Sequence, residues 1–247
     1  MKTTKQSHNF KLIKNVNKNT KKLLGTLLMA SLLFSSCDTN DGVDYVPAPD
    51  RPSAQEFANI REQALENVTQ HFQFNAEDGL ISLTSDNGVT ISINGNCLTK
   101  NGNAVSGTVD LEYVEVFEKG NMLTTNKPTM GLMPNGDKAL LITGGEFFLE
   151  ATQDGVPLET NCPLQLNVPA GLTGAPDNSM ILWTGVIDEN GDLTWDEMED
   201  DPAGQGENGV FVEGTEYYAF FNDFGWTNID RFYNDPRPKT TINVEVP

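Results

Sequence analysis

The sequence contains little histidine, and this scarcity excludes several kinds of active site. Only His8 and His71 occur in 247 residues. Zinc and iron sites built on histidine need more than one such ligand, so a histidine-based metal site is excluded. A Ser-His-Asp triad needs only one histidine, but the chain has no Gly-x-Ser-x-Gly motif to present the serine. His71 falls near the end of a predicted helix, where the helix dipole favours a histidine for structural reasons.

The sequence also lacks a long hydrophobic run, and beyond its first 22 residues it is poor in basic residues. The run LLGTLLMASLLF is shorter than the stretch of about 20 apolar residues that crosses a bilayer. Seven of the 16 Lys and Arg residues precede residue 37, so nine remain against 35 acids, a formal charge of −26. Nucleic acids and anionic lipid surfaces bind clustered Lys and Arg. Both are therefore excluded as partners, and we predict a solvated acidic surface.

The N-terminal segment has the order of features found in secretory signal peptides. A leader with seven lysines and no acid precedes the apolar run, and Ser35 and Ser36 lie directly before Cys37. The stretch LFSSC resembles the lipobox of bacterial lipoproteins, in which the cysteine thiol is acylated and becomes the new N-terminus. The resemblance implies a signal peptide over 1–36 and a lipid anchor on Cys37, which adds about 0.8 kcal/mol per buried methylene. The alternative is a buried N-terminal helix with an incidental cysteine.

Acidic residues follow Cys37 immediately, in the order CDTNDGVD. This segment is similar to the acidic tether of Bacteroidota lipoproteins, which directs export to the outer face of the outer membrane. The resemblance implies a tether over 37–52, an outer-membrane location and a domain that faces the cell exterior. A competing rule holds in enteric bacteria, where Asp directly after the cysteine retains the protein in the inner membrane. The prolines of the tether predict an extended conformation.

Two further cysteines, Cys97 and Cys162, form an even pair in a chain that we expect to be exported. Such a pair predicts a disulfide, which would close a loop of 65 residues. The alternative is two separate buried thiols. The chain has no Cys-x-x-Cys or Cys–His spacing, so no structural zinc site is predicted.

The segment after the tether has the pattern of one amphipathic helix, which we place over 53–74. SAQE is a capping-box sequence, with Ser53 as the N-cap and Glu56 three residues later. Apolar residues then recur at helical spacing as far as Phe72. We expect this apolar stripe to pack against the sheet that follows.

From residue 79 the pattern changes to short β-branched and aromatic runs separated by turns. Asn-Gly, the strongest short-range hairpin dipeptide, occurs at 87–88, 94–95, 101–102, 135–136, 190–191 and 208–209. In the longest run the apolar positions change parity, which predicts a β-bulge near Tyr113. The pattern predicts an all-β fold, an antiparallel β-sandwich over 75–247 with one N-terminal helix. A division into two subdomains near 170–178 stays open.

The strand series from about 80 to 170, which ends in LNVPAGL, faintly resembles the ZU5-like sandwiches of surface and signalling proteins. A glycine-rich hairpin leads to a proline-terminated strand in both. The resemblance supports the sandwich and implies no particular function.

The segment DENGD matches part of a calcium-binding loop. Asp188, Asn190 and Asp192 occupy ligand positions and Glu199 the twelfth position, but Leu193 stands where the loop requires glycine. Flanking β-type runs favour a hairpin instead. We predict no cofactor, with calcium as an open alternative that Glu197, Asp200 and Asp201 would share.

The richest local pattern lies in residues 216–238, which hold eight aromatic side chains. One interpretation is an exposed platform for stacking sugars, formed by Trp226, Asn228, Asp230, Arg231 and Tyr233. The other interpretation, which we favour, is a core strand from Tyr217 to Phe221 followed by a loop that Trp226 locks, because aromatic side chains dominate cores.

These patterns predict a lipid-anchored, non-catalytic surface module that binds a glycan, a peptide or an outer-membrane partner. A carbohydrate hydrolase is one alternative, because the chain is rich in acids. Such an enzyme needs two carboxyls about 5 Å or about 6.5–9.5 Å apart, and no pair in the sequence stands out. A membrane-proximal spacer of a longer lipoprotein is the other alternative.

Overall fold

The computed structural model describes residues 51–189, 191–198 and 209–234. In these ranges the chain forms sixteen β-strands and two α-helices, and residues from 52 onward belong to one compact unit. The prediction of an all-β protein is therefore confirmed. The predicted signal peptide, Cys37 and nearly all of the predicted tether lie outside the described residues. Within the described part of the chain, no helix has the length and hydrophobicity needed to cross a membrane.

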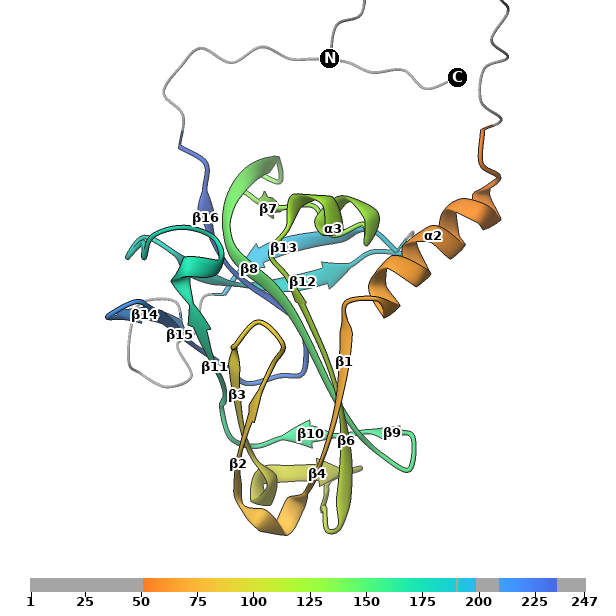
Figure 1. The fold of residues 1–247 in the computed structure, drawn as a ribbon, viewed down its shortest axis with the longest axis vertical. Helices are drawn as coiled ribbons and strands as arrows, with labels where there is room; N and C mark the ends of the chain where they lie inside the picture. The colour runs from red at the N-terminus through yellow and green to blue at the C-terminus, as the bar shows by residue number, and fades with distance from the viewer. Residues whose placement is uncertain (1–50, 190, 199–208, 235–247) are drawn as a thin grey trace, which may run out of the picture. The chain divides into compact units, whose positions relative to one another are not determined.

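The larger sheet contains a small closed barrel (Figure 1). The strands of the larger sheet follow the order β1-β6-β8-β16-β12-β13-β7, with β9 paired to β8. Strand β7 also pairs with β8. Five strands, β8, β16, β12, β13 and β7, therefore close into a ring. Every described pairing in the sheet is antiparallel except the bridge between β13 and β7. The bounds are β1 (Thr69–Asn75), β6 (Thr108–Val116), β7 (Met130–Leu132), β8 (Lys138–Gln153), β9 (Val156–Pro157), β12 (Ile181–Ile187), β13 (Leu193–Glu197) and β16 (Gly225–Phe232).

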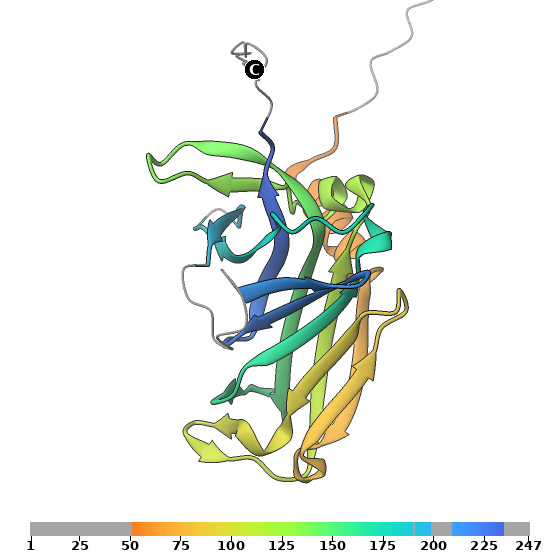
Figure 2. The same ribbon diagram turned by 90° about the vertical axis from the view of Figure 1, so that its left-hand side faces the viewer.

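A second sheet of five antiparallel strands follows the order β14-β15-β11-β3-β2 (Figure 2). A third, smaller sheet joins β10, β4 and β5 near the opposite end of the unit from the helices (Figure 1). The bounds are β2 (Leu80–Thr84), β3 (Thr90–Asn94), β4 (Leu98–Lys100), β5 (Asn103–Ala104), β10 (Glu159–Thr160), β11 (Leu164–Pro169), β14 (Val210–Glu213) and β15 (Glu216–Phe221).

Helix α2 (Ala54–Glu66) begins where the sequence predicts it. The Ser53 hydroxyl accepts a hydrogen bond from the Glu56 amide at 3.2 Å, and the Glu56 carboxylate accepts one from the Ser53 amide at 2.7 Å. The predicted capping box is therefore present. These bonds from the Ser53 backbone and side chain lower the pKa of Glu56, because they favour its ionised form.

The helix is shorter than the predicted range of 53–74, because the residues after Glu66 turn into the sheet. Phe72 and Phe74 alternate along β1, and Phe72 lies opposite Leu111 of β6. Phe72 therefore belongs to a strand that pairs with β6, although its spacing from the preceding apolar residues also fits a helix. His71, predicted near a helix end, lies in the same strand with an exposed side chain.

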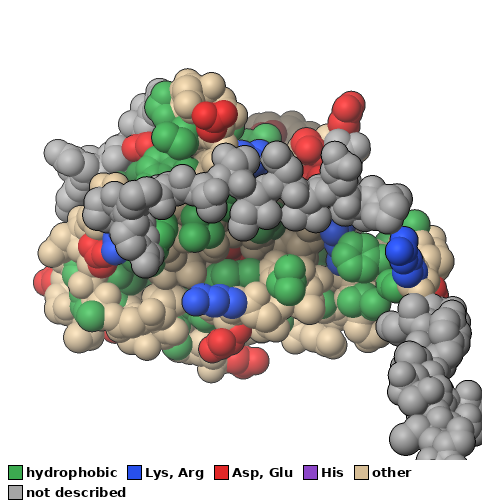
Figure 3. Space-filling model, turned by 90° about the horizontal axis from the view of Figure 1, so that it is seen from above, with side chains coloured by type: hydrophobic (Ala, Val, Ile, Leu, Met, Phe, Trp, Pro, Cys, Tyr) green, Lys and Arg blue, Asp and Glu red, His purple; other side chains and the backbone are tan. Residues whose placement is uncertain are grey.

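The apolar stripe of α2 packs against the core only at its C-terminal end. Leu65 near the end of α2 and Val68 just after the helix reach the core, whereas Phe57 is 48% and Ile60 52% exposed. The predicted packing of the whole stripe is therefore wrong. A short second helix, α3 (Lys119–Thr124), lies beside α2 and exposes Leu123. Figure 3 views this end of the unit, where hydrophobic side chains reach the surface between a few charged ones.

Two hydrophobic cores meet along β6. The first core takes side chains from both large sheets, and the second fills the barrel end with Trp183, Trp195 and Trp226. Tyr113 points into the first core, and its neighbour Val114 points into the second. The ladders of β6 with β1 and β8 run through this point without a register shift. The predicted bulge near Tyr113 is therefore wrong: both parities are apolar because both faces of β6 are covered.

Three of the four Asn-Gly pairs that the structure describes in full, at 87–88, 101–102 and 135–136, join paired strands. Asn101 and Gly102 both have positive φ, 51° and 77°, and link β4 to β5 in the way that a tight hairpin requires. Asn94–Gly95 differs, because Gly95 begins a short 3-10 turn in which a Cβ would collide with the carbonyl of Ala76. Asn190 and Asn208 lie outside the described residues.

The predicted disulfide between Cys97 and Cys162 is confirmed, and the alternative of two separate thiols is wrong. The two Cα atoms lie 5.7 Å apart. The bond joins the turn before β4 to the segment between β10 and β11. It therefore fastens the smallest sheet, which has few paired residues of its own.

Candidate functional site

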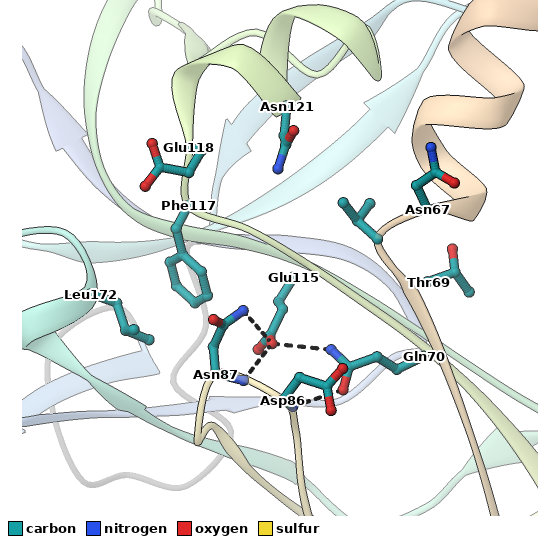
Figure 4. A pocket seen from close by; sticks show the side chains of 11 residues that line it. Asn67, Thr69, Gln70, Asp86, Asn87, Glu115, Phe117, Glu118, Asn121 and Leu172 are labelled. Atoms are coloured by element: carbon teal, nitrogen blue, oxygen red, sulfur yellow. Dashed lines mark hydrogen bonds between the residues drawn. The ribbon is translucent and has the colours of Figure 1, made fainter.

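A polar cleft of about 340 Å³ opens where β1, β6, α3 and the β2–β3 turn come together (Figure 4). Asp86 and Asn87 come from the turn, Glu118 and Asn121 from the start of α3, and Asn67 from the end of α2. In Figure 4 these side chains surround one space, with Phe117 and Leu172 on one side of it. The cleft thus gathers groups from segments that lie far apart in the sequence.

The floor of the cleft is the buried carboxylate of Glu115. Oε1 accepts hydrogen bonds from Gln70 Nε2 at 3.0 Å and from the Asn87 amide and side chain at 3.2 and 2.8 Å. Oε2 accepts from Ser85 Oγ at 2.7 Å and from the Tyr113 hydroxyl at 3.1 Å. Burial, and then the negative charge of Glu115, raise the pKa of Tyr113 well above its ordinary range.

Five donors occupy the acceptor positions of Glu115, which sets the role of this residue. A carboxylate offers about four lone-pair sites, so this one has no capacity left for a ligand. Its bonds instead hold the β2–β3 turn against β1 and β6. Ser85 Oγ also accepts the Val89 amide at 3.0 Å, which closes the turn. The network therefore fixes the shape of the cleft before any ligand arrives.

The rim of the cleft carries the groups that are free to act on a ligand. Asp86 and Glu118 are exposed carboxylates, and Asn67 and Asn121 are exposed amides. Half-buried Phe117 adds an aromatic ring. Such a set accepts hydrogen bonds, donates them and packs against an apolar face, which is what a polyhydroxylated ring requires.

A groove of about 480 Å³ between α2 and α3 continues the cleft. The two hollows share Asn67, Val68 and Asn121. Ile60 and Ala64 of α2 line the groove, so its wall is more apolar than the cleft rim. A ligand longer than one ring could extend from the cleft into this groove.

The predicted sugar-stacking residues do not line this cleft. Trp226 is 8% exposed and packs inside the barrel against Phe148 and Trp195, with ring centroids 5.2 and 6.5 Å away. Asn228 and Asp230 are fully buried beside it. The residues therefore do not form an exposed platform. The segment is also not the predicted loop, because Gly225–Phe232 forms β16, while Tyr217 and Phe221 face the core.

The barrel interior encloses an acidic cluster that sequence reasoning missed. A bulge at Gly144 and Gly145 brings Thr143 and Glu146 of β8 opposite Asp230 and Asn228 of β16. Asn228 Nδ2 donates to Asp230 Oδ2 at 3.0 Å. Neither oxygen of Glu146 has a hydrogen-bond partner within the described ranges.

Burial determines the charge of this cluster. Burial and the neighbouring Asp230 raise the pKa of Glu146 well above its ordinary range, against the opposing effect of Lys127. Burial also raises the pKa of Asp230 well above its ordinary range, although Thr143, Gly144 and Asn228 favour its ionised form. Lys127 lies over the Trp226 ring, 4.9 Å from its centroid, and burial lowers its pKa. Such a sealed pair of carboxyls cannot meet a substrate.

Arg231 and Tyr233, the other two predicted residues, lie at the end of β16. Arg231 Nε donates to Asp177 Oδ2 at 2.6 Å, so Arg231 fastens the loop before β12. Hydrogen bonds from Ser179, together with Arg231, lower the pKa of Asp177 to about 2. Tyr233 is 40% exposed.

The described residues of the DENGD segment, Asp188, Glu189, Gly191 and Asp192, lie in the hairpin between β12 and β13. The Asp188 amide donates to the Asp192 carbonyl at 3.0 Å, and Trp183 to Ile187 pair with Glu197 to Leu193. Asn190 and Glu199, two of the candidate calcium ligands, lie outside the described residues, as do Asp200 and Asp201. Within the described ranges, no three or more His, Cys, Asp and Glu side chains are grouped in a way that could hold a metal ion.

The fold and the cleft together define an all-β protein with a closed five-stranded barrel and a polar cleft beside its helical end. No protein-family model, no curated protein and no solved structure matches the chain.

Proposed function

We propose that the protein is a lipid-anchored lipoprotein of the outer membrane whose folded domain binds glycans at the cell surface. The N-terminal lysines, the LFSSC stretch and the acids after Cys37 support the anchor and the surface location. The observation that carries the binding function is the cleft: exposed carboxylates and amides surround a space beside the Phe117 ring.

The chemistry of the cleft favours a sugar over other ligands. Sugar hydroxyls donate to carboxylates such as Asp86 and Glu118, and charge-assisted hydrogen bonds of this kind are the stronger ones. The amides of Asn67 and Asn121 both donate and accept, which matches vicinal hydroxyls. The volume of about 340 Å³ lies at the lower end of the range for ligand pockets, so it suits one or two sugar rings.

Binding fits the cleft better than hydrolysis does. A glycosidase needs one carboxyl with a raised pKa and a second carboxyl across the substrate. Glu115 is saturated by its five donors. The carboxyls that have a raised pKa, Glu146 and Asp230, are sealed in the barrel. We therefore propose a non-catalytic module.

We further propose that the two large sheets form a β-sandwich. One core cluster takes side chains from both sheets, including Leu111 and Phe147 from the larger sheet and Ile91 and Leu166 from the second. A core enclosed between two sheets is the arrangement of a sandwich. The closed barrel is then an extension of one layer of the sandwich.

Binding can be tested with a Cys37→Ser chain, which we expect to be soluble, on a panel of immobilised neutral and acidic glycans. We expect binding to at least one glycan and a loss of about tenfold or more in Asp86→Asn, because a hydrogen bond to a charged group contributes about 1.5–3 kcal/mol. Glu159→Gln, an exposed acid on β10 away from the cleft, is the matched control. Equal binding by Asp86→Asn and the parent would place the ligand elsewhere. A chain that binds no glycan would remove the proposed function.

The anchor can be tested separately in cells. The parent should fractionate with membranes and incorporate a labelled fatty acid, and Cys37→Ser should do neither. Protease added to intact cells should digest the domain if it faces the exterior. A Cys37→Ser protein that stays membrane-bound would contradict the anchor. Protection from protease until the outer membrane is opened would contradict the surface location.

A further inference from the structure

The outer face of the second sheet carries a second set of groups suited to ligand binding, apart from the cleft. Side chains alternate across these strands, and Leu164, Leu166 and Val168 of β11 point into the core. Gln165 and Asn167 therefore lie on the opposite, outer face, where both are partly exposed. The same alternation in the other four strands defines the rest of this outer face.

Three aromatic rings stack on the outer face at the β14–β15 edge. The Phe211 ring lies 5.0 Å from that of Tyr218 with an interplanar angle of 7°, and 5.9 Å from that of Phe220 with an angle of 11°. All three side chains are partly exposed. The stack is therefore an apolar surface of nearly parallel rings that solvent can reach.

Uncharged polar side chains continue the surface from the ring stack across the sheet. Tyr218 lies opposite Asn167 and Phe220 opposite Gln165, and Gln165 Nε2 donates to Asn167 Oδ1. The rows then run on through hydroxyl-bearing residues of β3 and β2. These are Thr90 and Ser92 of β3, paired with Thr84 and Ser82 of β2. Each row thus passes from rings to amides to hydroxyls.

Charge is confined to one end of this outer face. Among the outward positions of the five strands in the described ranges, the charged side chains are Glu213 and Glu216, which pair with each other. The rest of the face is neutral, although the whole chain has a formal charge of −19. Charged polymers such as nucleic acid and acidic or basic peptides find no complementary charge there. An uncharged ligand rich in hydroxyls fits.

We propose that this outer face binds the chain of an uncharged polysaccharide laid across the strands. Neighbouring strands lie about 4.8 Å apart, so the five strands span roughly 19 Å, long enough to contact several sugar units. The ring stack packs against the apolar faces of the sugars, and the amides and hydroxyls bond their hydroxyl groups. This binding surface uses none of the cleft residues, so it goes beyond the proposed cleft site.

Affinity electrophoresis of the Cys37→Ser chain through gels that contain a soluble neutral β-glucan, mannan or xyloglucan tests the proposal. We expect at least one of these polymers to retard the parent, and Tyr218→Ala to lose tenfold or more of the affinity. Asn167→Ala, which removes an amide without touching the ring stack, should lose affinity as well. Leu123→Ala, which truncates an exposed leucine of α3 outside this sheet, is the matched control and should bind like the parent.

The comparison with Asp86→Asn separates this site from the cleft. Asp86→Asn should still bind the polymer, whether or not it binds small glycans. If Tyr218→Ala fails to fold, Asn167→Ala decides the question, because its side chain is partly exposed and its loss leaves no cavity in the core. Full polymer binding by Asn167→Ala and by a folded Tyr218→Ala would overturn the proposal, and if Tyr218→Ala does not fold, full binding by Asn167→Ala alone would do so. Retardation by acidic polysaccharides alone, or capture of peptides alone, would overturn it too.

Discussion

Glu146 lies directly opposite Asn228 across the β8–β16 ladder, yet neither oxygen of its carboxylate is hydrogen-bonded within the described part of the chain. A buried polar group without a partner is costly, and a buried carboxyl avoids much of this cost when it binds a proton. The barrel therefore favours a neutral Glu146. Asp230 lies nearby, and its negative charge would further disfavour an ionised Glu146. The pKa of Asp230 is itself raised by burial.

The stability of the protein should fall as the pH rises above the ordinary carboxyl range. The folded state holds protons on Glu146 and Asp230 that the unfolded chain has already released, so folding is favoured at low pH. This contribution is fully present below the unfolded pKa of about 4 and is lost as the pH rises through the raised values. Urea denaturation at several pH values measures the slope.

Glu146→Gln should make that slope shallower by up to about 1.4 kcal/mol per pH unit, which is the limit for one titrating proton. Lys127, whose pKa burial lowers, acts with the opposite sign and stays present in both proteins. An unchanged slope in Glu146→Gln would show that Glu146 is ionised in the fold.

Trp226→Ala should destabilise the protein by about 3–5 kcal/mol, as truncations of buried aromatic residues do. Trp226 packs against Phe148 and Trp195 and under Lys127, so its loss opens a cavity in the barrel core. Leu123→Ala, on a residue of α3 that is 81% exposed, should change stability by less than about 1 kcal/mol. A Trp226→Ala variant that melts like the parent would contradict the core role of this ring.

Gly145→Ala should cost about 2–4 kcal/mol, because positive φ and overpacking each cost about 1–3 kcal/mol. Gly145 has φ of 130°, and a Cβ there would lie 2.6 Å from Phe117 and 2.7 Å from Phe147. Gly120→Ala, in α3 with open space around it, should instead be neutral or stabilising. Thermal melts of the two variants compare them directly, and equal melting temperatures would argue against a required glycine in the bulge.

Removing the disulfide with Cys97→Ala and Cys162→Ala together should lower stability by about 2–4 kcal/mol, since the bond closes a long loop in the unfolded chain. Urea denaturation measures the loss. Reductant should destabilise the parent to a similar extent and leave the double variant unchanged. A parent that reductant does not affect would show that the bond contributes little.

The sequence predicted the features that depend on neighbouring residues. The capping box of Ser53 and Glu56 is local, and so is the turn at Asn101–Gly102. The disulfide was predicted because only two cysteines follow Cys37. In each case a short stretch or a simple count determines the feature, without knowledge of which strands pair.

Features that depend on distant pairing could not be predicted. Phe72 fits a helical spacing with Val68 and a strand alternation with Phe74, and only the ladder with β6 decides between them. Glu115 resembles any other acid in an acidic chain, although four residues from two strands and a turn converge on it. Glu146 and Asp230 become buried neighbours only once five strands close a ring.

Strand β8, with 16 residues, supplies backbone hydrogen bonds to β6 on one side and to β16 and β7 in the barrel. The barrel and the two-sheet core both need β8 for their strand pairing. If the chain were divided between them, one part would keep β8 and the other would lose the hydrogen bonds that β8 supplies. The barrel therefore cannot be excised from the rest of the domain without breaking the ladders of β8.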